Sequence, residues 1–212
     1  GAAWVGGLLS LALVFALGGP ERQAGTGRLL LAGVVVGTML GSITVLILLL
    51  GHRDTNQILR WMMGSTSPMF WERVVLLAFS LVAGALVLLR QARALNTVAM
   101  TGRLASTLGV DADRLTRIVL WTGSAMVGVC VGAVGLIGFV GLAAPHIART
   151  LFGPDLRKTL PASALLGGTL LLFADVIAIR LLPGVEMPVG AVTAVLGAPV
   201  LLYLLRQREN AI

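Results

Sequence analysis

Hydrophobic residues fall in long, continuous runs along this chain, separated by short polar connections. The runs do not alternate in polarity, as the strands of a membrane barrel would. A helix needs roughly 20 apolar residues to cross the hydrocarbon of a bilayer, and most of the runs approach that length. The pattern therefore predicts seven membrane segments, at about residues 2–17, 29–50, 74–89, 118–136, 137–147, 160–179 and 189–205.

The composition supports lipid rather than water as the surrounding solvent. The chain has 212 residues, of which 57% are hydrophobic and 12% are charged, whereas a soluble domain carries about 25% charged residues. Backbone groups in lipid must be hydrogen-bonded within the chain, so spans are helices or a closed barrel. Continuous runs favour helices. We therefore predict an all-α polytopic transmembrane helical bundle that forms a single domain over residues 1–212.

The basic residues are distributed unevenly between the two sides of this predicted bundle. Cytoplasmic loops of membrane proteins are enriched in Lys and Arg, so the net charge of +7 indicates orientation rather than nucleic-acid binding. A cytoplasmic C-terminus places the N-terminus outside and predicts that an odd number of earlier spans is missing. It puts twelve basic residues inside (Arg22, Arg28, Arg90, Arg93, Arg103, Arg114, Arg117, Arg149, Arg157, Lys158, Arg206 and Arg208) and four outside (Arg53, Arg60, Arg73 and Arg180).

The outer connection at 54–64 reads as a short amphipathic helix. Ile58, Trp61 and Met62 fall on one of its faces, and Gly64 can end it. Trp61 and Trp71 are suited to anchor it at the membrane interface. Covering the bundle and taking part in function are equally good interpretations of this helix.

The inner connection at 96–117 reads as a helical elbow. Thr101 can cap a first short helix that ends at Gly109, and Asp111 or Asp113 can cap a second that runs into the next span. The elbow carries a small apolar patch in an otherwise polar loop, which needs a surface to pack on. That surface is either the chain's own bundle or another protein.

Two features lie within the spans themselves. Gly33, Gly37 and Gly41 recur every four residues, a stripe that lets another helix approach closely or lines a pathway. Asp175 is the one acid inside a span, where carboxylates are costly. It lies near the outer end of its span, within reach of Arg180 or water.

Motifs of catalysis and metal binding are absent from the sequence. There is no nucleotide-binding lysine loop, HExxH, CxxC or GxSxG. His52 and His146 stand far apart without a carboxylate cluster, and Cys130 lies in an apolar run, so structural roles are favoured for all three. We expect no catalytic residues, no metal site and no cofactor.

Several stretches resemble the FecCD family of permeases, which import ferric siderophores, heme and cobalamin. They are ASTLGV at 105–110, GLIGFVGLAAPHIART at 135–150, FGPDLRKTLPASALLGG at 152–168, AD at 174–175 and EMPVGAVTAVLGAPVLLYLL at 186–205, with WMMGS at 61–65 and Trp71 upstream. Family members have ten spans, so the resemblance implies that this chain holds spans four to ten. We expect weak or absent transport without the first three.

The resemblance also implies a function and a set of partners. It implies the membrane permease of a bacterial ABC importer, a homodimer in the inner membrane that moves a metal chelate by alternating access. A separate dimer of ATP-binding subunits would hydrolyse ATP, and a periplasmic or lipid-anchored binding protein would deliver the cargo. Ferric siderophore is the first expectation for that cargo, then heme, then cobalamin.

Residue roles follow from the same resemblance. The elbow at 96–113 resembles coupling helices that bind the ATPase, the second segment resembles the helix lining the central pathway, and the 55–64 helix resembles an outer gate. Arg180 resembles a docking arginine, although it lies one position later than the family pattern, where Ile179 stands. The expected residues are Arg103, Leu104, Ser106, Leu108 and Gly109 for coupling, and Gly33, Gly37, Gly41, Trp61, Met62 and Gly64 for the pathway and gate.

Two other classes of protein can be weighed against this one. An ion-coupled secondary transporter would need several intramembrane carboxylates or broken helices with polar linings. A membrane-integral enzyme would need His, Asp or Glu clustered at one depth. The sequence offers neither, so the importer permease is favoured.

Overall fold

A computed structural model of the chain describes residues 2–18, 26–50, 58, 61–67, 69–101, 105, 109–181, 187–197 and 199. Regular structure in these residues is helical throughout. The elements are α1 (Ala2–Gly18), α2 (Thr26–Leu50), α4 (Trp71–Thr101), α5 (Ala112–Val134), α6 (Val140–Phe152) and α7 (Leu156–Leu181). A further helix, at residues 189–197, follows α7.

Four helices are long and apolar enough to cross a membrane: Leu31–Leu50 in α2, then α4, α5 and Leu156–Arg180 in α7. At 1.5 Å per residue, the 23 residues of α5 extend about 35 Å, which exceeds a hydrocarbon core of about 30 Å. α1 and α6 are shorter, at 17 and 13 residues. The lengths agree with the predicted bundle of transmembrane helices.

Burial follows the pattern expected in lipid. The buried apolar side chains are mostly alanines, whereas Leu50, Leu165 and Phe79 are 77%, 75% and 72% exposed. Small residues let helices approach closely where no water drives association. Gly84 is an example, because a Cβ there would overlap the Met126 side chain of α5.

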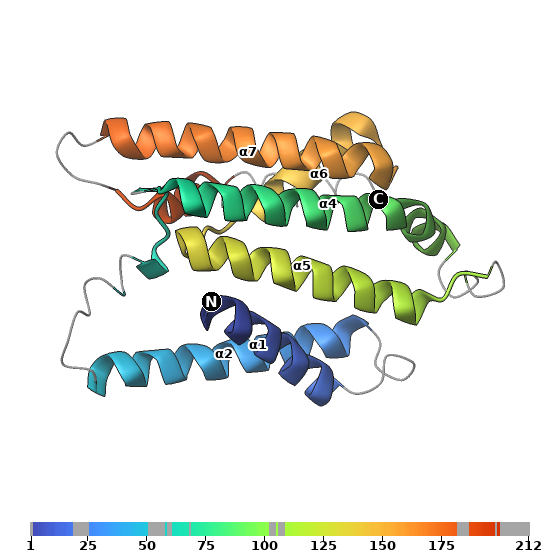
Figure 1. Cartoon of the computed structure of the whole chain (residues 1–212), viewed down its shortest axis with the longest axis horizontal. Coiled ribbons are helices and arrows are strands. Elements are labelled where there is room, and N and C mark those ends of the chain that lie inside the picture. Colours follow the sequence, from blue (N-terminus) through green and yellow to red (C-terminus); the bar gives the residue numbers. More distant parts are fainter. Residues whose placement is uncertain are drawn as a thin grey trace.

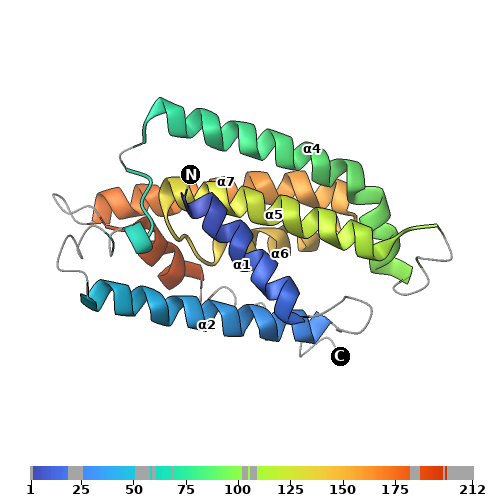
Figure 2. The ribbon, with the colours of Figure 1, turned by 60° about the horizontal axis from the view of Figure 1, so that its bottom comes forward.

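The helices run roughly parallel to the long axis of the molecule. In Figure 1, α4, α5 and α7 lie along that axis, and α6 lies beside α7. α1 crosses α5 and stacks Phe15 on Trp121, with ring centroids 6.5 Å apart. Figure 2 shows α2 at the edge of the bundle, where it packs on α1.

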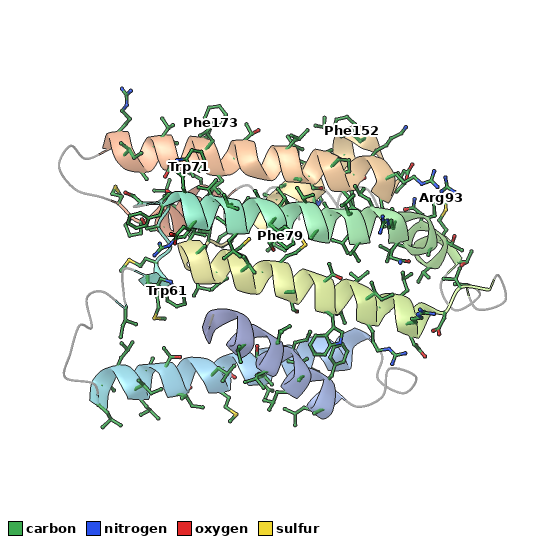
Figure 3. The ribbon with its side chains drawn as sticks, viewed as in Figure 1. Trp61, Trp71, Phe79, Arg93, Phe152 and Phe173 are labelled. Atoms are coloured by element: carbon green, nitrogen blue, oxygen red, sulfur yellow. The ribbon has the colours of Figure 1, made fainter. Side chains whose placement is uncertain are left out.

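The two ends of the bundle differ in charge. Among the residues whose side chains are described, Arg90, Arg93, Arg114, Arg117, Arg149, Arg157 and Lys158 belong to one end, and Arg73 and Arg180 to the other. In Figure 3, Arg93 and Phe152 lie toward the first end, and Trp61 and Trp71 toward the second. We name these the inner and outer ends, since basic residues favour the cytoplasmic side.

Some boundaries differ from the sequence expectation. Residues 96–101 continue α4 instead of opening a separate elbow, and Thr101 caps no new helix, since its hydroxyl bonds back to the Thr97 carbonyl oxygen at 2.7 Å. No glycine or proline interrupts the sequence between Gly84 and Gly102. The polar residues after the apolar run therefore continue α4 as a helix to Thr101. The segment predicted at 137–147 corresponds to α6, which continues to Phe152 with Pro145 inside the helix.

Candidate functional site at the two ends of the bundle

Three segments distant in sequence meet at the outer end: residues 61–67, the link 134–139 between α5 and α6, and the start of the 189–197 helix. Backbone hydrogen bonds join them. The Ser65 amide donates to the Val134 carbonyl oxygen at 2.9 Å, and the Gly190 amide donates to the Gly64 carbonyl oxygen at 3.4 Å. We call residues 61–67 the gate segment, after the role expected from the sequence.

Glycine is required where these segments touch. Gly64 and Gly135 have φ angles of 71° and 76°, in the left-handed region that side chains disfavour. A Cβ at Gly135 would lie closer than 3.0 Å to the Trp61 carbonyl oxygen, and one at Gly190 equally close to that of Met63. We call Gly64, Gly135 and Gly190 the glycine junction.

The link between α5 and α6 carries further backbone strain. Phe139 has φ 65°, an uncommon conformation for an aromatic residue. Its side chain packs so closely on Gly197 that a Cβ at position 197 would overlap the Phe139 Cβ. Strained residues concentrate at functional sites and persist when their surroundings hold them. The close contact with Gly197 of the 189–197 helix is what surrounds Phe139 here.

Asp175 of α7 has a specific partner at this end. Its carboxylate accepts a hydrogen bond from the Thr66 hydroxyl of the gate segment. The sequence indicated that Asp175 could reach Arg180 or water, and the structure adds the Thr66 hydroxyl as a partner. The bond satisfies the acid inside α7 and connects α7 to the gate segment.

The expected gate and pathway residues divide into two groups. Gly64 ends the turn at 61–62, with its amide donating to the Trp61 carbonyl oxygen at 3.1 Å, and it belongs to the junction. Trp61 is 44% exposed and Met62 is half-buried. The three stripe glycines of α2 lie apart from this cluster, because nothing lies within 4 Å of a Cβ built at Gly33, Gly37 or Gly41.

Among the described residues, no other segment covers the face of α2 that carries these glycines. Of the side chains described in α2, only Val36 is buried, at 2% exposure. The hydroxyls of Thr38, Ser42 and Thr44 bond to carbonyl oxygens of their own helix. A packing partner for the stripe is thus absent from the described part of this chain.

Only part of the expected coupling elbow is described. Arg103, Leu104, Ser106 and Leu108 lie outside the described residues. Gly109 is exposed, with φ 79° and open space around it. Ala105 is fully buried, and its carbonyl oxygen accepts from the Val110 amide at 3.1 Å. Asp111, one of the two predicted caps, accepts from the Arg114 amide at 3.0 Å and starts α5.

A hydrogen-bonded clamp at the inner end was missed by sequence reasoning. The Asn96 amide nitrogen donates to the Asp155 carboxylate at 2.7 Å, and the Asn96 amide oxygen accepts from the Leu156 backbone at 3.0 Å. Asp155 also accepts from the Arg157 backbone at 3.0 Å. An Asp directly before a helix is a recognisable cap, but nothing in the sequence pairs Asn96 with it.

The remaining sequence candidates are not brought together. Arg180 is exposed in the last turn of α7, at the outer end where a docking residue would need to be. His146 is half-buried in α6, and His52 lies outside the described residues. Within the described residues, no three His, Cys, Asp or Glu side chains gather to hold a metal.

Comparison with known proteins gives these ends a context. The sequence model of the FecCD transport family matches residues 1–207. The chain is 40% identical over 208 residues to the cobalamin import system permease protein BtuC of Halobacterium salinarum, covering 98% of this chain and 56% of that protein. It is 39% identical over 186 residues to the Fe(3+)-citrate import system permease protein YfmE of Bacillus subtilis, covering 88% and 56%.

A solved structure shares the fold. The chain matches a metal-chelate type ABC transporter in an inward-facing conformation with a TM-score of 0.87 and 28% identity, covering 96% of this chain and 65% of that one. The predicted all-α transmembrane bundle and the resemblance drawn from the sequence are both confirmed. The chain spans a little over half the length of the two permeases named above.

Proposed function

Because the chain belongs to the FecCD transport family, we propose that it is the membrane permease of an ABC importer that moves a metal chelate across the bacterial inner membrane. The observation that supports this is the family match over residues 1–207, which includes both ends of the bundle. The chain makes no covalent change to its cargo. Its work is to present a pathway that opens alternately to the two sides.

The outer end supplies the gate in this proposal. The gate segment is fixed to three helices by the glycine junction and by Asp175. Segments packed this closely have few intermediate arrangements. The gate segment and the helices that it contacts are therefore expected to move together between discrete states, open and closed. Trp61, Met62 and Gly64 belong to this segment, and the Gly33, Gly37 and Gly41 face of α2 lines the path beside a second copy of the chain.

The inner end binds the subunit that supplies the energy for transport. Residues 102–110 form the surface that binds a separate ATP-hydrolysing subunit, with Arg103, Leu104, Ser106, Leu108 and Gly109 in contact with it. The α4 and α5 helices lead directly into and out of this surface. A substrate-binding protein docks on the opposite face, where Arg180 is exposed. Each partner favours a different gate state, which produces alternating access.

The relatives support a metal chelate as the class of cargo, but they do not identify which chelate is carried. The two permeases named above carry cobalamin and ferric citrate in their names at nearly equal identity, 40% and 39%. We take ferric siderophore as the first cargo to test, followed by heme and cobalamin. Competition among the three for the partner binding protein identifies the one that is carried.

Uptake into proteoliposomes tests the proposal. The full-length permease is reconstituted with its ATPase subunit and binding protein, and each radiolabelled chelate is supplied outside. Uptake should require ATP in the ATPase compartment and should disappear when the Walker lysine of the ATPase is replaced. Uptake driven by a proton or sodium gradient without ATP would contradict the proposal and favour an ion-coupled transporter.

A further inference from the structure

Helix α7 is held at both of its ends by side-chain hydrogen bonds from other segments. At the inner end Asn96 of α4 binds Asp155 and Leu156, and at the outer end Thr66 of the gate segment binds Asp175. Leu156 and Asp175 are separated by about 28 Å of helix at 1.5 Å per residue. One helix therefore joins the two candidate ends across the whole bundle.

The inner attachment uses both ends of the Asn96 side-chain amide. Asn96 donates through its amide nitrogen and accepts through its amide oxygen, and the side chain is partly buried. Asn96 stands five positions before the end of α4 at Thr101, where the chain enters the elbow. Any displacement of the last turns of α4 is thus applied directly to the start of α7.

The outer attachment connects α7 to the gate. Thr66 lies two positions after Gly64, so its bond to Asp175 continues the glycine junction onto α7. Ala174 and Ala178 flank Asp175 and are buried against Val189 and Val192 of the 189–197 helix. The end of α7 therefore moves together with the gate segment and that helix.

The two attachments belong to one continuous helix, because α7 runs without a break through its 26 residues from Leu156 to Leu181. Pro161 removes one backbone hydrogen bond near the inner end. The hydroxyl of the buried Thr159 shares its one proton between the carbonyl oxygens of Gly153 and Asp155, both at 2.9 Å, and so ties that turn to the residues before it. A hydrogen-bonded helix packed along α6 and α4 is stiff over this length. It transmits a displacement rather than absorbing it.

We propose that α7 transmits movement between the inner elbow and the outer gate segment, with Asn96 and the Thr66–Asp175 pair as the positioning residues at its two ends. This rests on the proposed function, because it assigns the path by which movement caused by ATP hydrolysis at the inner end reaches the gate segment. The two attachments act in series. Breaking either one interrupts the route, so breaking both adds no further loss.

The test measures how strongly the binding protein, added outside, stimulates ATP hydrolysis inside proteoliposomes that hold the full-length permease and its ATPase. This readout needs no knowledge of the cargo. Thr66→Val removes the hydroxyl donor at similar volume, and Asn96→Asp places a carboxylate against Asp155. Each should reduce the stimulation roughly five- to tenfold, the factor given by one lost hydrogen bond of ordinary strength.

Two further variants separate transmission from simple structural support. The double variant Thr66→Val/Asn96→Asp should show the loss of one single variant, because the attachments act in series. The exchange variant Asn96→Asp/Asp155→Asn again sets one amide donor opposite one carboxylate between the two side chains, but the amide at position 155 cannot also accept from the Arg157 backbone through the same atom. It should therefore recover part of the stimulation. It also keeps the test available if Asn96→Asp alone does not fold, which melting temperature in detergent reports.

Matched controls are available on the same helices. Thr97 and Thr169 hydroxyls bond to carbonyl oxygens of their own helices, so Thr97→Val and Thr169→Val should leave the stimulation unchanged. Losses that multiply in the double variant, or an exchange variant that folds without recovering, would overturn the proposal. A wild-type complex without any stimulation would instead count against the proposed function.

Discussion

Gly135 offers the sharpest test of the glycine junction, because two separate costs of a side chain can be worked out there. Its φ of 76° and ψ of −162° lie in a region that is essentially restricted to glycine, which costs an alanine at least about 1–2 kcal/mol. A Cβ would also overlap the Trp61 carbonyl oxygen, and backbone cannot rotate aside, so overpacking adds about 1–3 kcal/mol. Gly135→Ala should therefore lower the free energy of unfolding by about 2–5 kcal/mol.

Two other glycines separate these costs. Gly153 has φ 80° with nothing within 4 Å of a Cβ, so Gly153→Ala should cost only the backbone share, about 1–2 kcal/mol. Gly138 lies in the same link as Gly135, with open space and no left-handed φ. Gly138→Ala should change stability by less than about 0.5 kcal/mol.

The assay is equilibrium unfolding of the full-length permease in mixed detergent micelles, followed by tryptophan fluorescence. The predicted order of loss is Gly135→Ala, then Gly153→Ala, then Gly138→Ala. Equal losses for Gly135→Ala and Gly153→Ala would refute the close contact with Trp61. A Gly135→Ala variant as stable as the wild type would refute the junction altogether.

Three further predictions concern the proposed roles. Deleting Leu108 and Gly109 should uncouple ATP hydrolysis from uptake, and normal uptake in proteoliposomes would contradict the coupling role. Gly37→Ile should leave the melting temperature of the permease within a few degrees, because nothing in the described chain meets that position, yet should lower uptake at least severalfold; unchanged uptake would exclude Gly37 from the pathway. Arg180→Glu should weaken binding of the outside binding protein roughly tenfold or more through charge reversal, measured by surface plasmon resonance on nanodiscs, and unchanged affinity would remove the docking role.

The fold class could be predicted because lipid imposes a simple rule on sequence. Uncharged runs such as 29–50 need helices to satisfy their backbone, and the structure has α2 over Thr26–Leu50. The end of α4 was harder to predict. Residues 96–101 look like a polar connection, but α4 continues through them to Thr101, so polarity and helix boundary do not coincide there.

The sites were less predictable, because they depend on pairs that only the fold brings together. The WMMGS stretch and the glycines after α5 were both noticed in the sequence. Their mutual contact depends on the return of the chain at residues 134–139, which no local pattern encodes. Asp175 was identified as unusual but assigned to Arg180 or water, since a hydroxyl 109 positions away in sequence gives no signal. The pairing of Asn96 with Asp155 could not be predicted either, because the two residues are also far apart in sequence.

The proposed function requires that these helices face lipid and that their inner end binds a separate ATPase. Native mass spectrometry of the detergent-solubilised complex, co-expressed with its ATPase subunit, tests both parts at once. We predict an assembly of two permease and two ATPase chains that requires detergent and loses its ATPase chains when residues 108 and 109 are deleted. A permease that is monomeric, soluble without detergent and free of ATPase would contradict it.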